Sequence, residues 1–183
     1  MAGCLLRLVT LSLLFRCSYP LQQLIHSPGT AANDDKFGIS LAIGSVGGYM
    51  VVGEKGTNKA YVFVEDGDTW SNTDTLVAST DKFAQNVAVY DETIVVSNHK
   101  YDVSSDKGHA FVYKLVSGSW TNTAEIVSDV SGHKKFSESG VAVYGSTVAI
   151  GTKETDDVAI YSDTGTKQDS VSVTDIKGIP LYG

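Results

Sequence analysis

The feature that most limits the fold of this chain is a segment that occurs three times. The first copy, residues 35–64, reads DKFGISLAIGSVGGYMVVGEKGTNKAYVFV: an aromatic residue, then three short apolar strands joined by polar turns. The lead aromatics are Phe37, Phe83 and Phe136, at spacings of 46 and 53 residues. A second marker, Trp70 and Trp120, recurs after 50 residues. A period of this length with about four short strands per unit is typical of a β-propeller.

The composition agrees with a fold made of strands and tight turns. The 18 glycines suit turns, and the nine tyrosines, together with many Val and Thr residues, suit strands. No convincing apolar helical stripe follows residue 20. The sequence therefore predicts an all-β fold, a partial β-propeller of about three four-stranded blades.

The repeats also predict where the units begin and end. The three blades are expected at about 37–77, 83–127 and 136–162, and 21–26 is expected to be an outer strand of a preceding blade. Residues 163–183 are expected to form a weakly structured tail, in which the alternating segment 170–174 could be a last strand. Which of these two extra strands completes an outermost position stays open at this point.

Residues 1–20 differ in character from the repeats. An apolar run from Leu8 to Phe15 follows the positive charge of Arg7, and the run is too short to span a bilayer. This pattern favours a signal peptide and hence a secreted or cell-surface protein, although the cleavage site is only approximate. A strand pair left over from an upstream unit, or a misplaced start of the reading frame, would explain the same residues.

The charge of the chain excludes one class of partner and restricts another. The formal net charge is −7, whereas a nucleic-acid-binding protein needs a basic face. The two arginines, Arg7 and Arg16, both precede the repeats. The repeats therefore have no guanidinium group to form paired hydrogen bonds with a carboxylate or a phosphate. Cys4 and Cys17 also lie there, which leaves the repeats without disulfide or thiolate chemistry. We expect no nucleic-acid partner and no catalytic or cofactor-binding residues.

One loop concentrates polar and aromatic side chains. The segment 99–107 lies between two strands of the second unit, and binding contacts of propellers lie on such loops. Its candidate ligand-binding residues are His99, Tyr101, Asp102 and Asp106. The histidines have no spacing that fits a metal site, and a solvated loop without function is the plainer interpretation.

The repeats resemble FG-GAP repeats, the blades of the integrin α-chain propeller. The residues that carry the resemblance are Phe37, Gly38, Ser40, Gly53, Phe83, Gly108, Phe136 and Gly151. The sequence departs from the family pattern after the lead aromatic, where glycine becomes Ala84 and Ser137. Calcium is implied by the family, but the DxDxDG loop that binds it is absent, and the adjacent residues Asn33, Asp34 and Asp35 do not replace it. We therefore expect no metal.

The resemblance implies a non-catalytic binding or adhesion module that presents rim loops to a protein or glycan ligand. A structural surface protein or a truncated propeller remnant is the alternative. A propeller-based glycoside hydrolase is disfavoured: residues 67–70 resemble the end of an Asp-box, but the repeats have no arginine to hold an acidic sugar. Three blades are also fewer than the four that usually close a ring, so self-association could complete the propeller.

Overall fold

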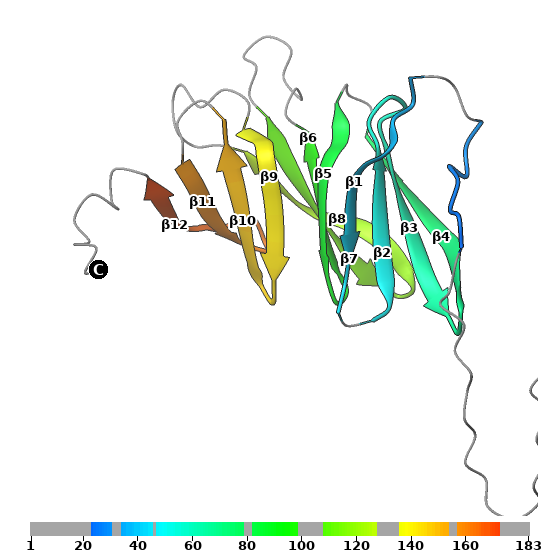
Figure 1. Ribbon diagram of the computed structural model, residues 1–183. Coiled ribbons are helices and arrows are strands. Elements are labelled where there is room, and N and C mark those ends of the chain that lie inside the picture. Colours follow the sequence, from blue (N-terminus) through cyan, green and yellow to red (C-terminus); the bar gives the residue numbers. More distant parts are fainter. Residues whose placement is uncertain are drawn as a thin grey trace, which may run out of the picture.

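The computed structural model describes residues 23–30, 34–45, 47–78, 82–98, 108–127, 136–153 and 157–172. For residues 171 and 172 only the backbone is described. Within these ranges the chain is all-β and forms three four-stranded antiparallel sheets (Figure 1). Each sheet is built from four consecutive strands, so each is one blade. The predicted partial β-propeller is therefore confirmed.

The strands follow one another along the chain as neighbours in each sheet. Blade 1 contains β1 (Phe37–Ile43), β2 (Tyr49–Glu54), β3 (Lys59–Asp66) and β4 (Thr69–Val77). Blade 2 contains β5 (Phe83–Tyr90), β6 (Thr93–Asn98), β7 (His109–Val116) and β8 (Ser119–Val127). Blade 3 contains β9 (Phe136–Tyr144), β10 (Thr147–Thr152), β11 (Asp157–Ser162) and β12 (Lys167–Ser172).

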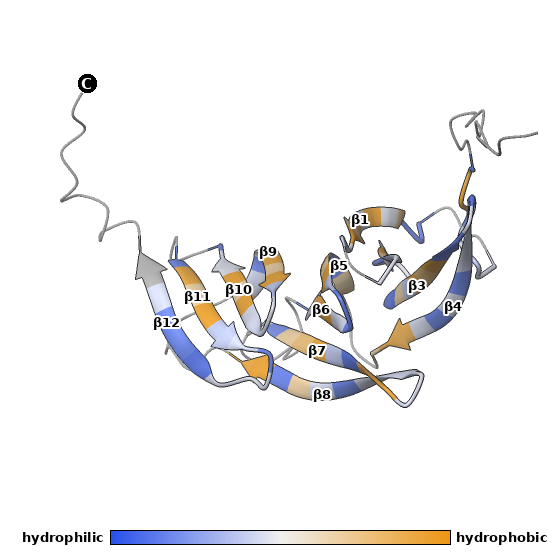
Figure 2. Ribbon diagram, turned by 90° about the horizontal axis from the view of Figure 1, so that it is seen from below, coloured by the Kyte–Doolittle hydropathy of each residue, from blue (hydrophilic) through white to orange (hydrophobic). Residues whose placement is uncertain are grey.

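The three blades form an arc, seen from below in Figure 2. The first strands, β1, β5 and β9, lie on its inner side, and β4, β8 and β12 lie on its outer side. The second strands of blades 1 and 2 are the most buried, and every residue of β6 is buried. A strand covered on both faces needs such a run instead of an alternating pattern.

The apolar core is a stack of layers between neighbouring blades. Val51 and Val62 of blade 1 pack with Phe83, Val87 and other residues of blade 2. A second layer joins blade 2 to blade 3 in the same way, with Val95 and Val112 on one side and Val148 and Ile150 on the other. Successive side chains of a strand point to opposite faces, so the central blade contributes to both layers.

A left-handed backbone conformation follows each lead aromatic. Gly38, Ala84 and Ser137 have φ values of 83°, 62° and 66°. A Cβ on Gly38 would meet nothing within 4 Å, so the positive φ is the reason that glycine fits there.

Two segments outside the repeats differ from expectation. The described part of the expected outer strand, residues 23–26, is not a strand. It lies along blade 1 instead, where the Gln23 amide exchanges two hydrogen bonds with the backbone of Trp70, at 3.0 and 2.7 Å. The last strand begins at Lys167, three residues before the expected start, and it completes blade 3. Residues 173 and 174 lie outside the described residues.

Gly53 provides a test of how closely blades 1 and 2 pack. A Cβ at this position would lie 2.2 Å from the hydroxyl oxygen of Ser40, a side chain of the same blade, and 2.3 Å from the backbone carbonyl oxygen of Ala84 in the next blade. We expect Gly53→Ala to lower the free energy of unfolding by about 2 kcal/mol, because the backbone of blade 2 must move away. Urea unfolding followed by fluorescence measures this value.

Gly151 of blade 3 is the matched control for Gly53. It occupies the corresponding position, opposite Gly140, and a Cβ there would meet the Ser139 side chain at 3.1 Å, with its three nearest atoms all in blade 3. We expect Gly151→Ala to change stability by less than about 1 kcal/mol. Equal losses in the two variants would contradict the assignment of the effect to contact between blades.

Candidate functional site

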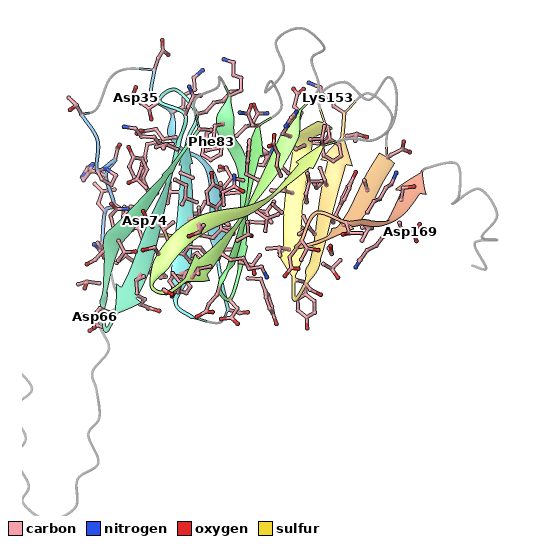
Figure 3. All side chains as sticks on the ribbon, turned by 180° about the vertical axis from the view of Figure 1, so that it is seen from behind. Asp35, Asp66, Asp74, Phe83, Lys153 and Asp169 are labelled. Carbon is pink, nitrogen blue, oxygen red and sulfur yellow. The ribbon has the colours of Figure 1, made fainter. Side chains whose placement is uncertain are left out.

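A polar cleft lies between blades 1 and 2, at the edge where β2 ends and β3 begins. It has a volume of about 280 Å³ and is lined by Asp34, Lys36, Lys55, Gly56, Asn58 and Lys82. The labelled residues Asp35 and Phe83, which neighbour this lining in sequence, both lie near this edge in Figure 3. Three lysines therefore come together from three separate segments of the chain.

The repeated backbone explains why two of the lysines meet. Lys36 and Lys82 directly precede the lead aromatics Phe37 and Phe83, and their φ values are 55° and 70°. Each of these lysines lies in the turn that leads into the first strand of its blade, here called the blade-entry turn. A positive φ is uncommon for lysine, so this turn must hold the conformation against the local preference. Because adjacent blades repeat the turn, equivalent lysines from both blades reach one cleft.

The third lysine belongs to the turn between β2 and β3. Lys55 donates a hydrogen bond to the side-chain oxygen of Gln85 in blade 2, which bridges the two blades beside the cleft. On the same turn, the amide of Gly56 donates to the carbonyl of Asp35 at 2.8 Å. A Cβ on Gly56 would lie 2.2 Å from the Asp34 carbonyl oxygen, so this turn requires glycine.

The lining of the cleft is positive, although the chain as a whole is negative. It contains three lysines and one carboxylate, Asp34, in a protein of net charge −7. Neither Lys36 nor Lys82 forms an ion pair with any described carboxylate. Ammonium groups arranged in this way attract a small anion such as a phosphate or a carboxylate.

A buried carboxylate stabilises the wall of the cleft. Glu54, the residue before Lys55, is only 1% exposed. Ser27 donates to its Oε1 at 2.5 Å, Tyr61 donates to its Oε2 at 2.9 Å, and the hydroxyl of Thr57 also donates to Oε2. These bonds join the segment 23–30, the β2–β3 turn and β3 around a single side chain.

The surroundings of Glu54 favour its charged form. Burial by itself raises the pKa of the carboxyl, but the hydroxyl donors Ser27, Thr57 and Tyr61, helped by the charge of Lys59, outweigh it. The pKa of Glu54 therefore lies below the ordinary value of 4.5. Burial is the main factor that raises the pKa of the Tyr61 phenol, and the neighbouring Glu54 carboxylate raises it further. The phenol therefore stays a neutral donor.

The ligand-binding residues predicted from the sequence are not part of this cleft. His99, Tyr101, Asp102 and Asp106 all lie outside the described residues, so their prediction is neither supported nor contradicted. The motif residues that are described serve packing and turn geometry; Phe83 and Phe136, for example, are fully buried. Among the described residues, no group of three or more His, Cys, Asp or Glu side chains is arranged to hold a metal.

Sequence reasoning missed the lysine cleft because it looked for arginine. The letters DKF occur before both β1 and β5, and this repetition was the available signal. Its meaning depends on the packing of two blades, which places residues 46 positions apart beside each other. Lys55 recurs as Lys153 in the third unit, but His99 stands at this position in the second unit, so the repetition was incomplete.

Comparison with known proteins identifies the fold only. No protein-family model matches the chain, and no curated protein matches it. Among solved structures, a Lactobacillus plantarum protein has a TM-score of 0.53 at 20% identity, covering 74% of this chain and 41% of the other. Saccharomyces cerevisiae Sqt1 gives 0.46 at 15% identity, with coverages of 76% and 37%. A putative 6-phosphogluconolactonase from Bacteroides fragilis has a TM-score of 0.49 at 15% identity, covering 73% of this chain and 38% of the other.

These matches correct the expected family. The chain spans about two fifths of the length of these three solved structures. No family model matches it, and the Lactobacillus plantarum protein is not described as an integrin or an FG-GAP protein. The FG-GAP assignment is therefore wrong, and so is the adhesion function drawn from it. Three blades with an aromatic entry residue are a general propeller pattern, which the family motif had made appear specific.

Among the described residues, no helix is both long and apolar enough to cross a membrane.

Proposed function

We propose that the cleft between blades 1 and 2 binds a small molecule carrying a doubly negative group, a phosphate or a pair of carboxylates. The observation that carries the proposal is the convergence of Lys36, Lys55 and Lys82 on one cleft. The single carboxylate in the lining, Asp34, leaves two positive charges in excess, which a dianion would balance. The ligand is small, because 280 Å³ is at the lower limit of ligand pockets.

The proposal is one of binding without turnover. A general glycosidase needs two carboxyl groups on opposite sides of the bond it cleaves, and the cleft lining offers one. Glu54 cannot serve as the second, since its oxygens already accept three hydroxyl donors behind the wall of the cleft. Extracellular location and a signal peptide stay predictions, which the N-terminal sequence of the secreted protein would test.

Inorganic phosphate is the simplest probe of the cleft. We expect it to bind the purified chain with millimolar affinity and to shift the amide resonances of the β2–β3 turn. The affinity is expected to fall as the salt concentration is raised. Titration followed by amide chemical shifts measures both the dissociation constant and the location. Chloride at equal ionic strength serves as the control for general screening.

The variant Lys82→Asn separates charge from stability. It removes one ammonium, and asparagine adopts the positive φ of this position, 70°, more readily than lysine. We expect phosphate affinity to fall about 10-fold, which corresponds to about 1.4 kcal/mol, with no loss of thermal stability.

Lys153→Gln is the matched control for charge. Lys153 lies at the same edge of the molecule but in blade 3, paired with Glu138 at 2.9 Å (Figure 3). We expect this variant to bind phosphate as the natural chain does. If both variants lose affinity equally, the effect comes from net charge and the cleft is not the site. Unchanged affinity in Lys82→Asn would also refute the proposal.

A further inference from the structure

The two ends of the arc present apolar faces that no described residue covers fully. On blade 1, every second residue of β1 from Ile39 onward is exposed: Ile39 by 49%, Leu41 by 59% and Ile43 by 61%. On blade 3, a shallow trough of about 330 Å³ is lined by Ser139, Ala142, Ala149, Gly151, Val158 and their neighbours. The face of blade 1 has large side chains, whereas that of blade 3 has small ones.

Strand register identifies these two faces as the two halves of one repeated interface. Leu41 pairs with Val52, Val87 with Val96, and Val141 with Ile150. Leu41 therefore corresponds to Val87, which blade 2 packs against blade 1, and to Val141, which packs against blade 2. In blade 1 the same position faces outward.

The small residues of blade 3 have equally clear counterparts. Ala42 pairs with Val51, Ala88 with Val95, and Ala142 with Ala149. Ala42 is packed against the layer that contains Phe83 and Val87, and Ala88 belongs to the layer between blades 2 and 3. Ala142 is the exposed member of this set. The trough is thus the surface on which the first strand of a following blade would lie.

A polar contact accompanies the apolar one at both internal interfaces. The Ser40 hydroxyl donates to the carbonyl of Ala84 in the next blade at 3.0 Å. The Asn86 amide donates to the carbonyl of Ser137 in the next blade at 3.1 Å. In each pair the acceptor is the residue after a lead aromatic.

The free faces carry a corresponding donor and acceptor. Ser139 lies over Gly151 as Ser40 lies over Gly53, although blade 3 has one more residue between Phe136 and its paired valine. The residue after the lead aromatic of blade 1 is Gly38, which is exposed. Both halves of the contact are therefore present on the chain, at opposite ends of the arc.

We propose that the blade 3 face of one chain docks onto the blade 1 face of a second copy, head to tail. The large side chains of β1 would enter the trough of small residues, and Ser139 would donate to the Gly38 carbonyl of the partner. A second copy is the occupant because one chain carries both complementary halves, in the register seen twice inside it. Such an interface is heterologous, so it produces a closed ring or an open chain of copies.

The test uses two lysine substitutions, one on each face. Leu41→Lys changes an exposed residue of blade 1, and Ala142→Lys changes an exposed residue of the trough. Sedimentation velocity of the natural chain is expected to give a multiple of the 19.5 kDa chain mass in the micromolar range. Each variant alone is expected to sediment as a monomer with unchanged circular dichroism.

Mixing the two variants provides the decisive observation. Leu41→Lys keeps an intact blade 3 face and Ala142→Lys keeps an intact blade 1 face, so an equimolar mixture is expected to form a dimer. Val116→Lys, at an exposed valine near the β7–β8 turn, is the matched control and is expected to associate as the natural chain does. These results are independent of phosphate binding, since the lysine cleft contains none of the changed residues.

Three outcomes would overturn the proposal. A natural chain that stays monomeric throughout the micromolar range would show that the faces do not bind each other. Association lost in Leu41→Lys but kept in Ala142→Lys would indicate a symmetric contact between two blade 1 faces. A mixture that stays monomeric, although each variant is folded, would show that the two faces are not complementary.

Discussion

Replacing Phe83 with alanine is expected to lower the free energy of unfolding by about 4 kcal/mol and the Tm by roughly 12 °C. The phenyl ring is fully buried in the layer between blades 1 and 2. It packs edge-on against Phe111, with ring centroids 5.9 Å apart. The substitution removes the transfer free energy of the ring, leaves a cavity and abolishes the aromatic pair. Calorimetry and urea unfolding measure the change.

The equivalent substitution in blade 1 is the matched control. The ring of Phe37 packs against that of Tyr61, with ring centroids 5.8 Å apart. It is only partly buried, because no described blade covers that face. We expect Phe37→Ala to lower the free energy of unfolding by about 1–2 kcal/mol. Equal effects of the two substitutions would mean that contact between blades 1 and 2 does not stabilise the fold more than contacts within a blade do.

The fold could be predicted because its signals are local and repeated. The lead aromatics, the apolar second strands such as residues 49–54 and the short turns each specify one hairpin, and three copies confirm one another. The last strand was placed late because Lys167, Gln168 and Asp169 read as loop residues. They are strand residues because β12 is an outermost, largely exposed strand, where polar side chains are tolerated.

The N-terminal segment could not be predicted from its own residues. Leu24 and Ile25 form an apolar pair of the kind found in a short strand, yet the segment 23–30 runs along blade 1 without joining a sheet. Its position depends on side chains: Gln23 reaches the backbone of Trp70, and Ser27 reaches Glu54. Contacts over distances of 47 and 27 residues leave no periodic pattern in a sequence.

The candidate site was missed for a related physical reason. A cleft formed by two blades takes its residues from turns, and some of these, such as Asn58, do not recur in the other repeats. The two lysines of the blade-entry turns were repeated, but their significance depends on the positive φ that brings them to one edge. A family motif was a poor guide here, since its aromatic and glycine positions report the packing of blades and carry no information about a ligand.

Glu54 is the second residue whose substitution is expected to have a large effect. Glu54→Gln keeps the shape of the side chain but replaces a charged acceptor of three hydroxyl bonds by an amide with one acceptor oxygen. We expect the free energy of unfolding at neutral pH to fall by about 3 kcal/mol. With the amide oxygen in the place of Oε2, the Ser27 hydroxyl loses its acceptor, and the bonds from Thr57 and Tyr61 become bonds to a neutral oxygen. Hydrogen bonds to a charged group contribute about 1.5–3 kcal/mol each, and those between neutral groups contribute about 0.5–1.5 kcal/mol. Chemical denaturation at pH 7 measures this loss.

Glu54→Asp is the matched control for the charge. It retains the carboxylate and shortens the side chain, so the network loses reach but keeps its acceptors. If Glu54→Asp and Glu54→Gln were equally unstable at neutral pH, the geometry of the network would matter and its charge would not. We expect Glu54→Asp to be the more stable of the two.

The pH dependence of the Glu54→Gln effect distinguishes charge from packing. Because the folded-state pKa of Glu54 lies below 4.5, the ionised carboxylate stabilises the folded chain above the unfolded-state pKa. This contribution is lost as the pH falls through the folded-state value, so the unfolding free energies of natural chain and variant should converge in acid. Denaturation curves collected from about pH 7 to pH 3 test this, since the other carboxylates titrate in both proteins and cancel. A difference that stays constant over that range would show that packing of the side chain, and not its charge, holds the segment 23–30 and the β2–β3 turn against blade 1.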